Sequence, residues 1–133
     1  MAKYTIVFDG GSKGNPGLGY GSYKLYSERG ELFHERLSFQ DRGNRVTNNE
    51  AEYLTLIGAL RTLIEILEER VPRSQVEVLG DSLLVISQLR GVWKVKKAEL
   101  RPFHQEALGL LKSFGKYELQ WHDRVNSVAI LGH

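Results

Sequence analysis

The spacing of apolar residues changes near Thr47, from every second residue to about every 3.6 residues, and this change limits the possible folds most. Residues 3–9 alternate between apolar and polar side chains, and residues 19–27 and 31–39 are rich in Tyr, Phe and Leu. These runs are typical of strands. The helical spacing then continues until shortly before Pro72. The sequence therefore predicts an antiparallel three-stranded meander followed by a long amphipathic helix, with Thr47 or Asn48 as its N-cap.

The rest of the chain alternates short strands with helices. Residues 75–81 predict a strand, residues 82–91 a short helix, residues 97–115 another helix, and residues 116–124 a last strand. Strands connected by helices usually pair in parallel, so we expect a mixed sheet with helices packed on it. The sequence contains no repeat or linker, and a single α/β domain over residues 1–133 is the prediction.

Composition excludes several classes of protein. The sequence has no cysteine, which rules out disulfides and thiolate metal sites. Residues 1–8 carry one lysine and too short an apolar run for a signal peptide, and no apolar stretch approaches the ~20 residues that span a bilayer. The net charge of +2 alone does not indicate nucleic acid, because the distribution of charge matters more. We expect a cytoplasmic monomer without a membrane partner.

The glycine-rich segment after Asp9, residues 10–17, does not match the known phosphate-binding loops. A Walker-type loop ends in GK[ST] and leads into a helix, and a dinucleotide-binding fingerprint also requires a helix next. Residues 19–27 instead predict a strand. Two interpretations remain, a polar turn at the end of a strand or a metal site that a phosphodiester backbone approaches closely.

Three acidic residues favour the metal site. Asp9 and Asp81 are each predicted at the end of a strand, and the two strands should run parallel, so their carboxylates would meet at one edge of the sheet. Glu52 lies one turn along the first helix from Asn48. Converging carboxylates without a paired lysine or arginine repel one another unless a cation neutralises them. Hard divalent ions such as Mg²⁺ prefer such oxygen ligands, and two of them about 3.5–4 Å apart can clamp a phosphodiester for in-line attack.

Four segments in this order, DGGSKGNPG, TNNEAEY, GDSLLVISQLRG and GVWKVK, resemble the type-I ribonuclease H family. The similarity covers residues 3–124 and includes the order of the elements. The resemblance implies a five-stranded mixed sheet, three antiparallel strands plus two parallel strands, flanked by helices. It also implies endonucleolytic cleavage of the RNA strand of RNA–DNA hybrids, with two Mg²⁺ or Mn²⁺ ions. The alternatives are a hybrid-binding module with weak or lost cleavage, and a scaffold that binds neither metal nor nucleic acid.

The resemblance assigns roles residue by residue. Asp9, Glu52 and Asp81 match the catalytic metal ligands. Other matched positions are implied to contact the hybrid: Gly10, Gly11, Ser12, Asn15, Arg45, Thr47, Asn48, Asn49, Trp93, Lys94 and Lys96. Among these, the asparagines resemble contacts to the minor groove, and Arg45 and Thr47 resemble a pocket for a DNA-strand phosphate. The run RGVWKVKK, residues 90–97, is called the basic segment below; on its own it would usually be a solvated surface. We expect His104 to be structural and Trp121 to lie in the core.

The sequence departs from the family near its C-terminal helix. The family has a fourth acid there, in a pattern like N-x-x-A-D, and this chain supplies Asn126 and Ala129 but has Ile130 at the acidic position. A gapless alignment places Leu131 there instead. We therefore expect a truncated C-terminal helix, either missing or reduced to one turn.

A substitute for the fourth acid is expected among the last residues. Asp123 is the electrostatic candidate, Asn126 the positional one, and His133 a third possibility. The alternative is that Asp123 caps the turn, pairs with Arg124 and touches no metal.

Overall fold

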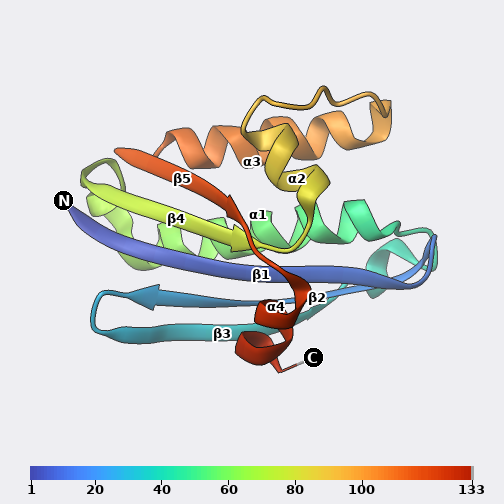
Figure 1. The fold of residues 1–133 in the computed structure, drawn as a ribbon, viewed down its shortest axis with the longest axis horizontal. Coiled ribbons are helices and arrows are strands. Elements are labelled where there is room, and N and C mark those ends of the chain that lie inside the picture. Colours follow the sequence, from blue (N-terminus) through green and yellow to red (C-terminus); the bar gives the residue numbers. More distant parts are fainter. Residues whose placement is uncertain (133) are drawn as a thin grey trace.

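The computed structural model describes residues 1–132, in which five strands form one mixed sheet of order β3-β2-β1-β4-β5 (Figure 1). The first three strands form an antiparallel meander, and β4 and β5 pair in parallel with β1 and β4 respectively. Their bounds are β1 Ala2–Gly14, β2 Gly17–Ser27, β3 Gly30–Ser38, β4 Ser74–Gly80 and β5 Lys116–Trp121. The predicted sheet of three antiparallel plus two parallel strands is confirmed.

Helices flank the sheet on both sides. The long helix α1 packs on β1 and β2, with α3 beside it, whereas α4 contacts β1 and β2 from the opposite face (Figure 1). The bounds are α1 Asn48–Leu67, α2 Leu83–Leu89, α3 Arg101–Lys112 and α4 Arg124–Leu131, with single 3₁₀ segments at η1 Gln40–Arg42, η2 Glu68–Arg73 and η3 Ala98–Leu100. None of the helices within residues 1–132 is long and apolar enough to cross a membrane.

The core lies between the sheet and α1. Alternate residues of the strands face the helix, and the apolar stripe of α1 covers them, so these side chains are excluded from water. The fully buried members include Ile6, Phe8, Tyr23, Leu25, Leu56, Leu60 and Leu63. Thr47 begins α1 as its N-cap: its hydroxyl accepts from the Glu50 amide at 3.2 Å, and the Glu50 carboxylate accepts from the Thr47 amide at 3.2 Å. This capping box fixes where the helix starts.

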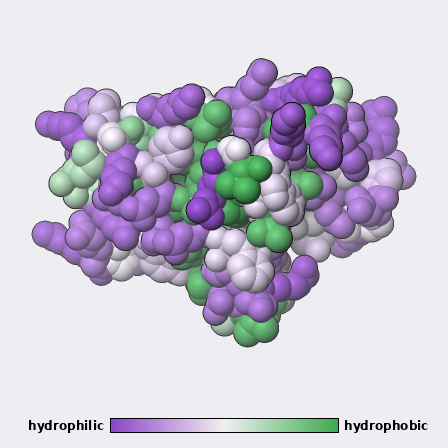
Figure 2. Space-filling view, turned by 45° about the horizontal axis from the view of Figure 1, so that its top comes forward, coloured by the Kyte–Doolittle hydropathy of each residue, from purple (hydrophilic) through white to green (hydrophobic). Residues whose placement is uncertain are grey.

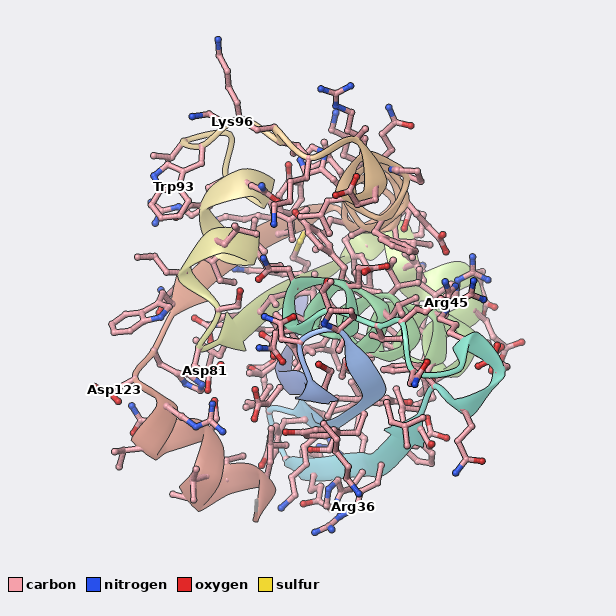
Figure 3. The ribbon with its side chains drawn as sticks, turned by 90° about the vertical axis from the view of Figure 1, so that its right-hand side faces the viewer. Arg36, Arg45, Asp81, Trp93, Lys96 and Asp123 are labelled. Carbon is pink, nitrogen blue, oxygen red and sulfur yellow. The ribbon has the colours of Figure 1, made fainter. Side chains whose placement is uncertain are left out.

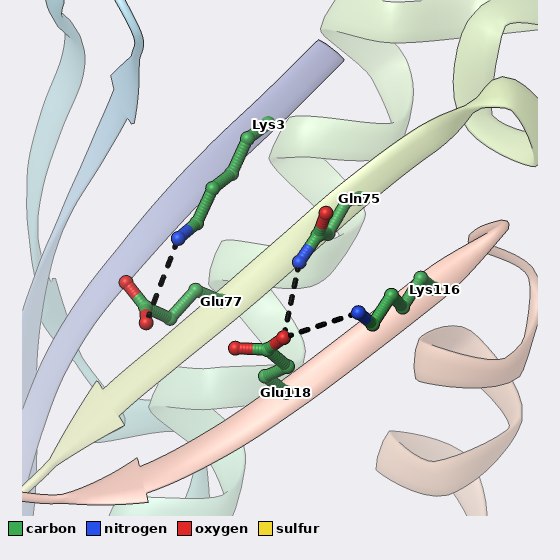
Figure 4. Close-up of polar contacts among 5 residues, drawn as sticks. All are labelled: Lys3, Gln75, Glu77, Lys116 and Glu118. Atoms are coloured by element: carbon green, nitrogen blue, oxygen red, sulfur yellow. Dashed lines mark hydrogen bonds and ion pairs between the residues drawn. The ribbon is translucent and has the colours of Figure 1, made fainter. Parts of the chain in front are cut away.

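The sheet face opposite α1 is polar near the start of the strands. Lys3 of β1 pairs with Glu77 of β4 at 3.8 Å, and Glu118 of β5 contacts both Lys116 at 3.5 Å and Gln75 at 3.2 Å (Figure 4). Such exposed ion pairs contribute roughly 0–1 kcal/mol each. This part of the sheet is therefore a solvated surface, consistent with the mostly hydrophilic exterior in Figure 2.

The glycine-rich segment belongs to a strand, so the prediction that the first strand ends at Asp9 is wrong. β1 pairs with β2 as far as Gly14 opposite Gly17, and only Asn15 and Pro16 form the turn. A Cβ at Gly10 would lie 2.6 Å from the carbonyl oxygen of Ala51. Glycine occurs here because α1 approaches the strand too closely for a side chain, one of the few reasons for glycine inside a strand.

Two boundaries near the C-terminus also differ from the prediction. β5 ends at Trp121, three residues earlier than expected, because Asp123 already caps α4 by accepting from the Val125 amide at 3.2 Å. α4 has eight residues, so the expectation that this helix is missing or one turn long is wrong. The predicted helix over residues 97–115 is also shorter: α3 has a proline, Pro102, in its first turn, where a missing amide hydrogen does no harm.

Candidate metal centre

Three carboxylates converge at the end of the sheet, as the sequence predicts. Because β1 and β4 are parallel neighbours with Phe8 opposite Gly80, Asp9 and Asp81 follow side by side. The first turns of α1 bring Glu52 to the same point. Each of the three residues offers an oxygen within 4.8 Å of the others, and Asp9 and Glu52 are 4% and 5% exposed.

Two oxygens of this cluster lack partners. Glu52 Oε1 accepts a hydrogen bond from the Gly10 amide, but Glu52 Oε2 and Asp81 Oδ2 are buried without a hydrogen-bond partner among residues 1–132. A buried acceptor without a partner costs about 1–3 kcal/mol, and more when it is charged. A cation between the carboxylates would supply the missing partner.

The electrostatics favour the same conclusion. Burial raises the pKa of Glu52 well above its usual value, and the hydrogen bond and charge of Asp9 raise it further. Burial and the charge of Asp9 also raise the pKa of Asp81, while the Ser127 hydroxyl and the charge of Arg124 oppose this. Without a cation, the cluster therefore favours protonation. A divalent ion would reverse this preference, and an all-oxygen donor set fits Mg²⁺ or Mn²⁺.

Asp81 is held from the side of β5 and α4. The Trp121 indole donates from Nε1 to the Asp81 carbonyl oxygen at 3.0 Å, and the His122 amide donates to the Gly80 carbonyl at 2.9 Å. His122 Nε2 lies 2.8 Å from Ser127 Oγ, and the fully buried Ser127 hydroxyl also bonds to the Asp81 side chain.

Trp121 is 48% exposed, so the prediction that it lies in the core is wrong. It stands at the end of β5, an edge strand of the sheet.

Sequence reasoning did not find Ser127. A serine inside a short helix has no signal of its own, and its contact with Asp81 depends on how α4 crosses the sheet. His104 is structural as expected: its Nε2 lies 3.2 Å from the Gln88 carbonyl oxygen.

Asp123, one of the residues proposed as a fourth ligand, is not part of the carboxylate cluster. Asp123 is exposed and caps α4, and Figure 3 shows it at the outer edge of the molecule, beyond Asp81. Asn126 is exposed, and Ile130 is half-buried. His133 lies outside the described residues. The acidic cluster within residues 1–132 contains only the three predicted acids. Of the alternative for Asp123, the structure shows the cap of α4, and whether Asp123 contacts a metal stays a prediction.

Three of the residues predicted to contact the substrate, Ser12, Asn15 and Asn48, are linked by hydrogen bonds. The Ser12 amide donates to Asn48 Oδ1 at 2.9 Å, and the Asn48 amide donates to Asn15 Oδ1 at 3.1 Å. These bonds hold the β1–β2 turn against the start of α1, with Asn49 beside it. Gly11 faces the protein, where a Cβ would lie 2.7 Å from the Tyr20 hydroxyl.

Two hollows flank this turn. Arg45 lines a cavity of about 340 Å³ together with Asp41, Arg42, Val46 and Glu50. On the other side, the basic segment and Asn49 line a cavity of about 520 Å³ that includes Trp93, Lys94 and Lys96. Trp93 is 45% exposed. Figure 3 shows Trp93 and Lys96 above Asp81 and Arg45 on the other side of the turn, so the predicted contacts extend on both sides of the cluster.

Comparison with known proteins agrees with this architecture. Residues 8–131 match a family model described as reverse transcriptase-like. The bifunctional protein Rv2228c of Mycobacterium tuberculosis is 36% identical over 126 residues, which cover 94% of this chain and 32% of that protein. Ribonuclease HI of Halobacterium salinarum is 36% identical over 112 residues, which cover 84% of this chain and 52% of that enzyme. The chain thus spans about a third to a half of the length of these curated relatives.

Solved structures show the same fold. The N-terminal RNase H domain of Rv2228c superposes with a TM-score of 0.85 at 30% identity, covering 97% of this chain and 88% of that one. LC11-RNase H1, solved in complex with an RNA/DNA hybrid, superposes with a TM-score of 0.84 at 28% identity, covering 95% and 89%. The three-plus-two sheet with its flanking helices is a ribonuclease H-like fold. The chain belongs to the type-I ribonuclease H family, as its four sequence motifs predict.

Proposed function

We propose that this protein is an endoribonuclease that cleaves the RNA strand of RNA–DNA hybrids. The observation that carries the proposal is the cluster of Asp9, Glu52 and Asp81, with two buried oxygens that lack partners. Membership of the ribonuclease H family and the hybrid complex of LC11-RNase H1 support this choice of substrate.

Asp9, Glu52 and Asp81 are the residues that would hold Mg²⁺ or Mn²⁺, two ions per site with substrate bound. Bound there, the ions would supply Lewis-acid activation of the attacking water and stabilisation of the leaving 3′-oxygen. The chain itself keeps the ligands in place: the Gly10 amide orients Glu52, and the Trp121 indole and Ser127 hydroxyl orient Asp81.

The hybrid would lie across the turn between the two hollows. Gly10, Ser12 and Asn15, with Asn48 and Asn49, would form the centre of this surface, where contacts to 2′-hydroxyls would distinguish RNA from DNA. Gly11 is buried, so it would act through the shape of the strand. Arg45 and Thr47 would contact a phosphate on one side, and Trp93, Lys94 and Lys96 would contact the backbone on the other. The monomeric state and cytoplasmic location stay predictions.

A second function has one observation in its favour. No carboxylate of α4 joins the cluster within residues 1–132, which suits a hybrid-binding module with weak or lost cleavage.

One experiment separates these functions. A labelled RNA–DNA hybrid, duplex DNA and duplex RNA are incubated with the protein in Mg²⁺, in Mn²⁺ and in chelator, and binding is measured with Ca²⁺. We expect cleavage of the hybrid alone, at internal RNA positions, and only with Mg²⁺ or Mn²⁺. Hybrid binding without cleavage would identify the binding module, and no preference for hybrid would contradict both functions.

A further inference from the structure

Gln88 of α2 is a buried polar side chain that joins three parts of the molecule. The Tyr53 hydroxyl of α1 donates to Gln88 Oε1 at 2.6 Å, and Gln88 Nε2 donates to the Lys94 carbonyl oxygen at 3.5 Å. Tyr53 is fully buried and Gln88 is 5% exposed. The Tyr53–Gln88 bond thus has no competition from bulk water.

The basic segment depends on this end of α2 for its position. It has no strand or helix between Gly91 and Lys97, and the Val92 and Trp93 amides both donate to the Ser87 carbonyl, at 2.9 and 3.2 Å. Gln88 adds the link to Lys94. The first part of the segment, as far as Lys94, is therefore attached through two consecutive residues of α2, whereas Val95 accepts a hydrogen bond from Arg101 Nε at 3.3 Å.

One turn of α1 provides a residue of the carboxylate cluster and also the residue that binds Gln88. Glu52 points into the cluster, and the next residue, Tyr53, binds Gln88. Gln88 also lines the cavity of about 520 Å³ beside Trp93 and Lys94. Two neighbouring residues of one helix thus connect the cluster with the glutamine that contacts the basic segment.

We propose that Tyr53 and Gln88 are positioning residues that hold the basic segment at a fixed distance from the carboxylate cluster, so that one hybrid duplex contacts both. This inference rests on the proposed function for its substrate. Neither residue is expected to touch the hybrid or the metal.

Tyr53→Phe tests the proposal because it removes one hydroxyl and keeps the ring. Tyr23→Phe is the matched control: Tyr23 is equally buried, and its hydroxyl bonds to Glu35 at 2.5 Å and Thr62 at 2.8 Å, between β2, β3 and α1. We expect Tyr53→Phe to weaken binding to a long hybrid by about threefold to tenfold, the range for one hydrogen bond, with kcat nearly unchanged. Tyr23→Phe should leave hybrid affinity unchanged. Equal losses in both variants would contradict the proposal.

Hybrid length provides a readout that a loss of stability alone would not move. A Lys94→Ala/Lys96→Ala double variant first defines the length at which hybrids begin to engage the basic segment. The effect of Tyr53→Phe should appear at the same length and vanish for shorter hybrids. A loss that is the same at every length would overturn the positioning role.

Amide hydrogen exchange separates this inference from the proposed function, because it needs no nucleic acid. Tyr53→Phe should accelerate exchange in the peptide that covers residues 90–97, and Tyr23→Phe should not. Faster exchange in a protein that binds no hybrid would contradict the proposed function alone. Unchanged exchange in an active enzyme would contradict the positioning role alone.

Discussion

The two sides of the carboxylate cluster are held in different ways. On the α1 side, Glu52 sits in a helix that packs on the core, starts with a capping box and touches the strand at Gly10. On the α4 side, Asp81 follows β4 and is only half-buried; its contacts come from Trp121 at the end of an edge strand and Ser127 in an eight-residue helix.

Several exposed apolar side chains lie on the second side. Leu83, Trp121, Val125 and Val128 are all more than 40% exposed, and Figure 2 shows apolar side chains near the middle of an otherwise hydrophilic face. A region with few buried apolar contacts opens locally at a smaller cost in free energy. The comparison indicates that the α1 side is fixed by the folding of the core, whereas the α4 side can be altered without unfolding the protein.

Asp9→Asn should have the largest effect, because Asp9 lies between the two sides. We expect cleavage to fall by about a thousandfold or more, since a carboxylate that would hold the ions is lost. The metal-free protein should unfold at the same or a higher temperature, because one of three crowded carboxylates becomes neutral. Turnover near that of the wild type would contradict the assigned metal centre.

Gly10→Ala should disturb the α1 side together with the fold. The new Cβ would meet the Ala51 carbonyl oxygen at 2.6 Å, so α1 must shift, at about 1–3 kcal/mol of unfolding free energy, and cleavage should fall with it. Gly109→Ala in α3 is the control, because a Cβ there meets no atom within 4 Å and alanine favours the helix. Chemical denaturation of both variants measures the difference. Equal stability would show that the close approach is not required.

Ser127→Ala should disturb the α4 side with a smaller loss of stability. Removal of its hydroxyl frees Asp81, so we expect cleavage to fall by about tenfold or less and to need more Mg²⁺, with a loss of about 0.5–1.5 kcal/mol. Asp123→Ala is the control, because it removes the cap of the same helix at about 1 kcal/mol without a contact to Asp81. A shift in metal requirement with Asp123→Ala alone would restore Asp123 as a ligand.

The pH dependence of stability should be the smallest effect. A carboxyl whose pKa is raised by folding takes up protons on folding, so it lowers stability as pH rises from its unfolded pKa, about 4, through the raised folded pKa. In the metal-free protein, this loss should begin above about pH 4 and should diminish in Glu52→Gln. Saturating Mg²⁺ should also diminish it. Denaturation curves across pH, compared between wild type and Glu52→Gln, provide the measurement.

Sequence patterns predicted the features that depend on periodicity. The helical spacing after Thr47 and the parallel crossover to β4 together placed Asp9, Glu52 and Asp81 at one point, which the structure confirms. Gly10 was misread because glycine is a turn signal locally, whereas its reason here is a helix that lies 41 residues further along the chain, at Ala51. For the same reason, Ser127 was not found and Trp121 was wrongly predicted in the core. Their contacts to Asp81 depend on how distant elements cross, which no local sequence pattern records.

The solvated sheet face makes this chain easy to label at a single chosen position. Among residues 1–132, the side chain of Lys116, at the start of β5, forms only an exposed ion pair with Glu118, so replacing it removes little free energy. It lies opposite Gln75, and the six residues from there to Asp81 span about 20 Å of strand. Because the sequence has no cysteine, Lys116→Cys would carry the one thiol of the chain. A fluorophore attached there could report the arrival of a nucleic acid at the opposite end of the sheet without occupying the surface it binds.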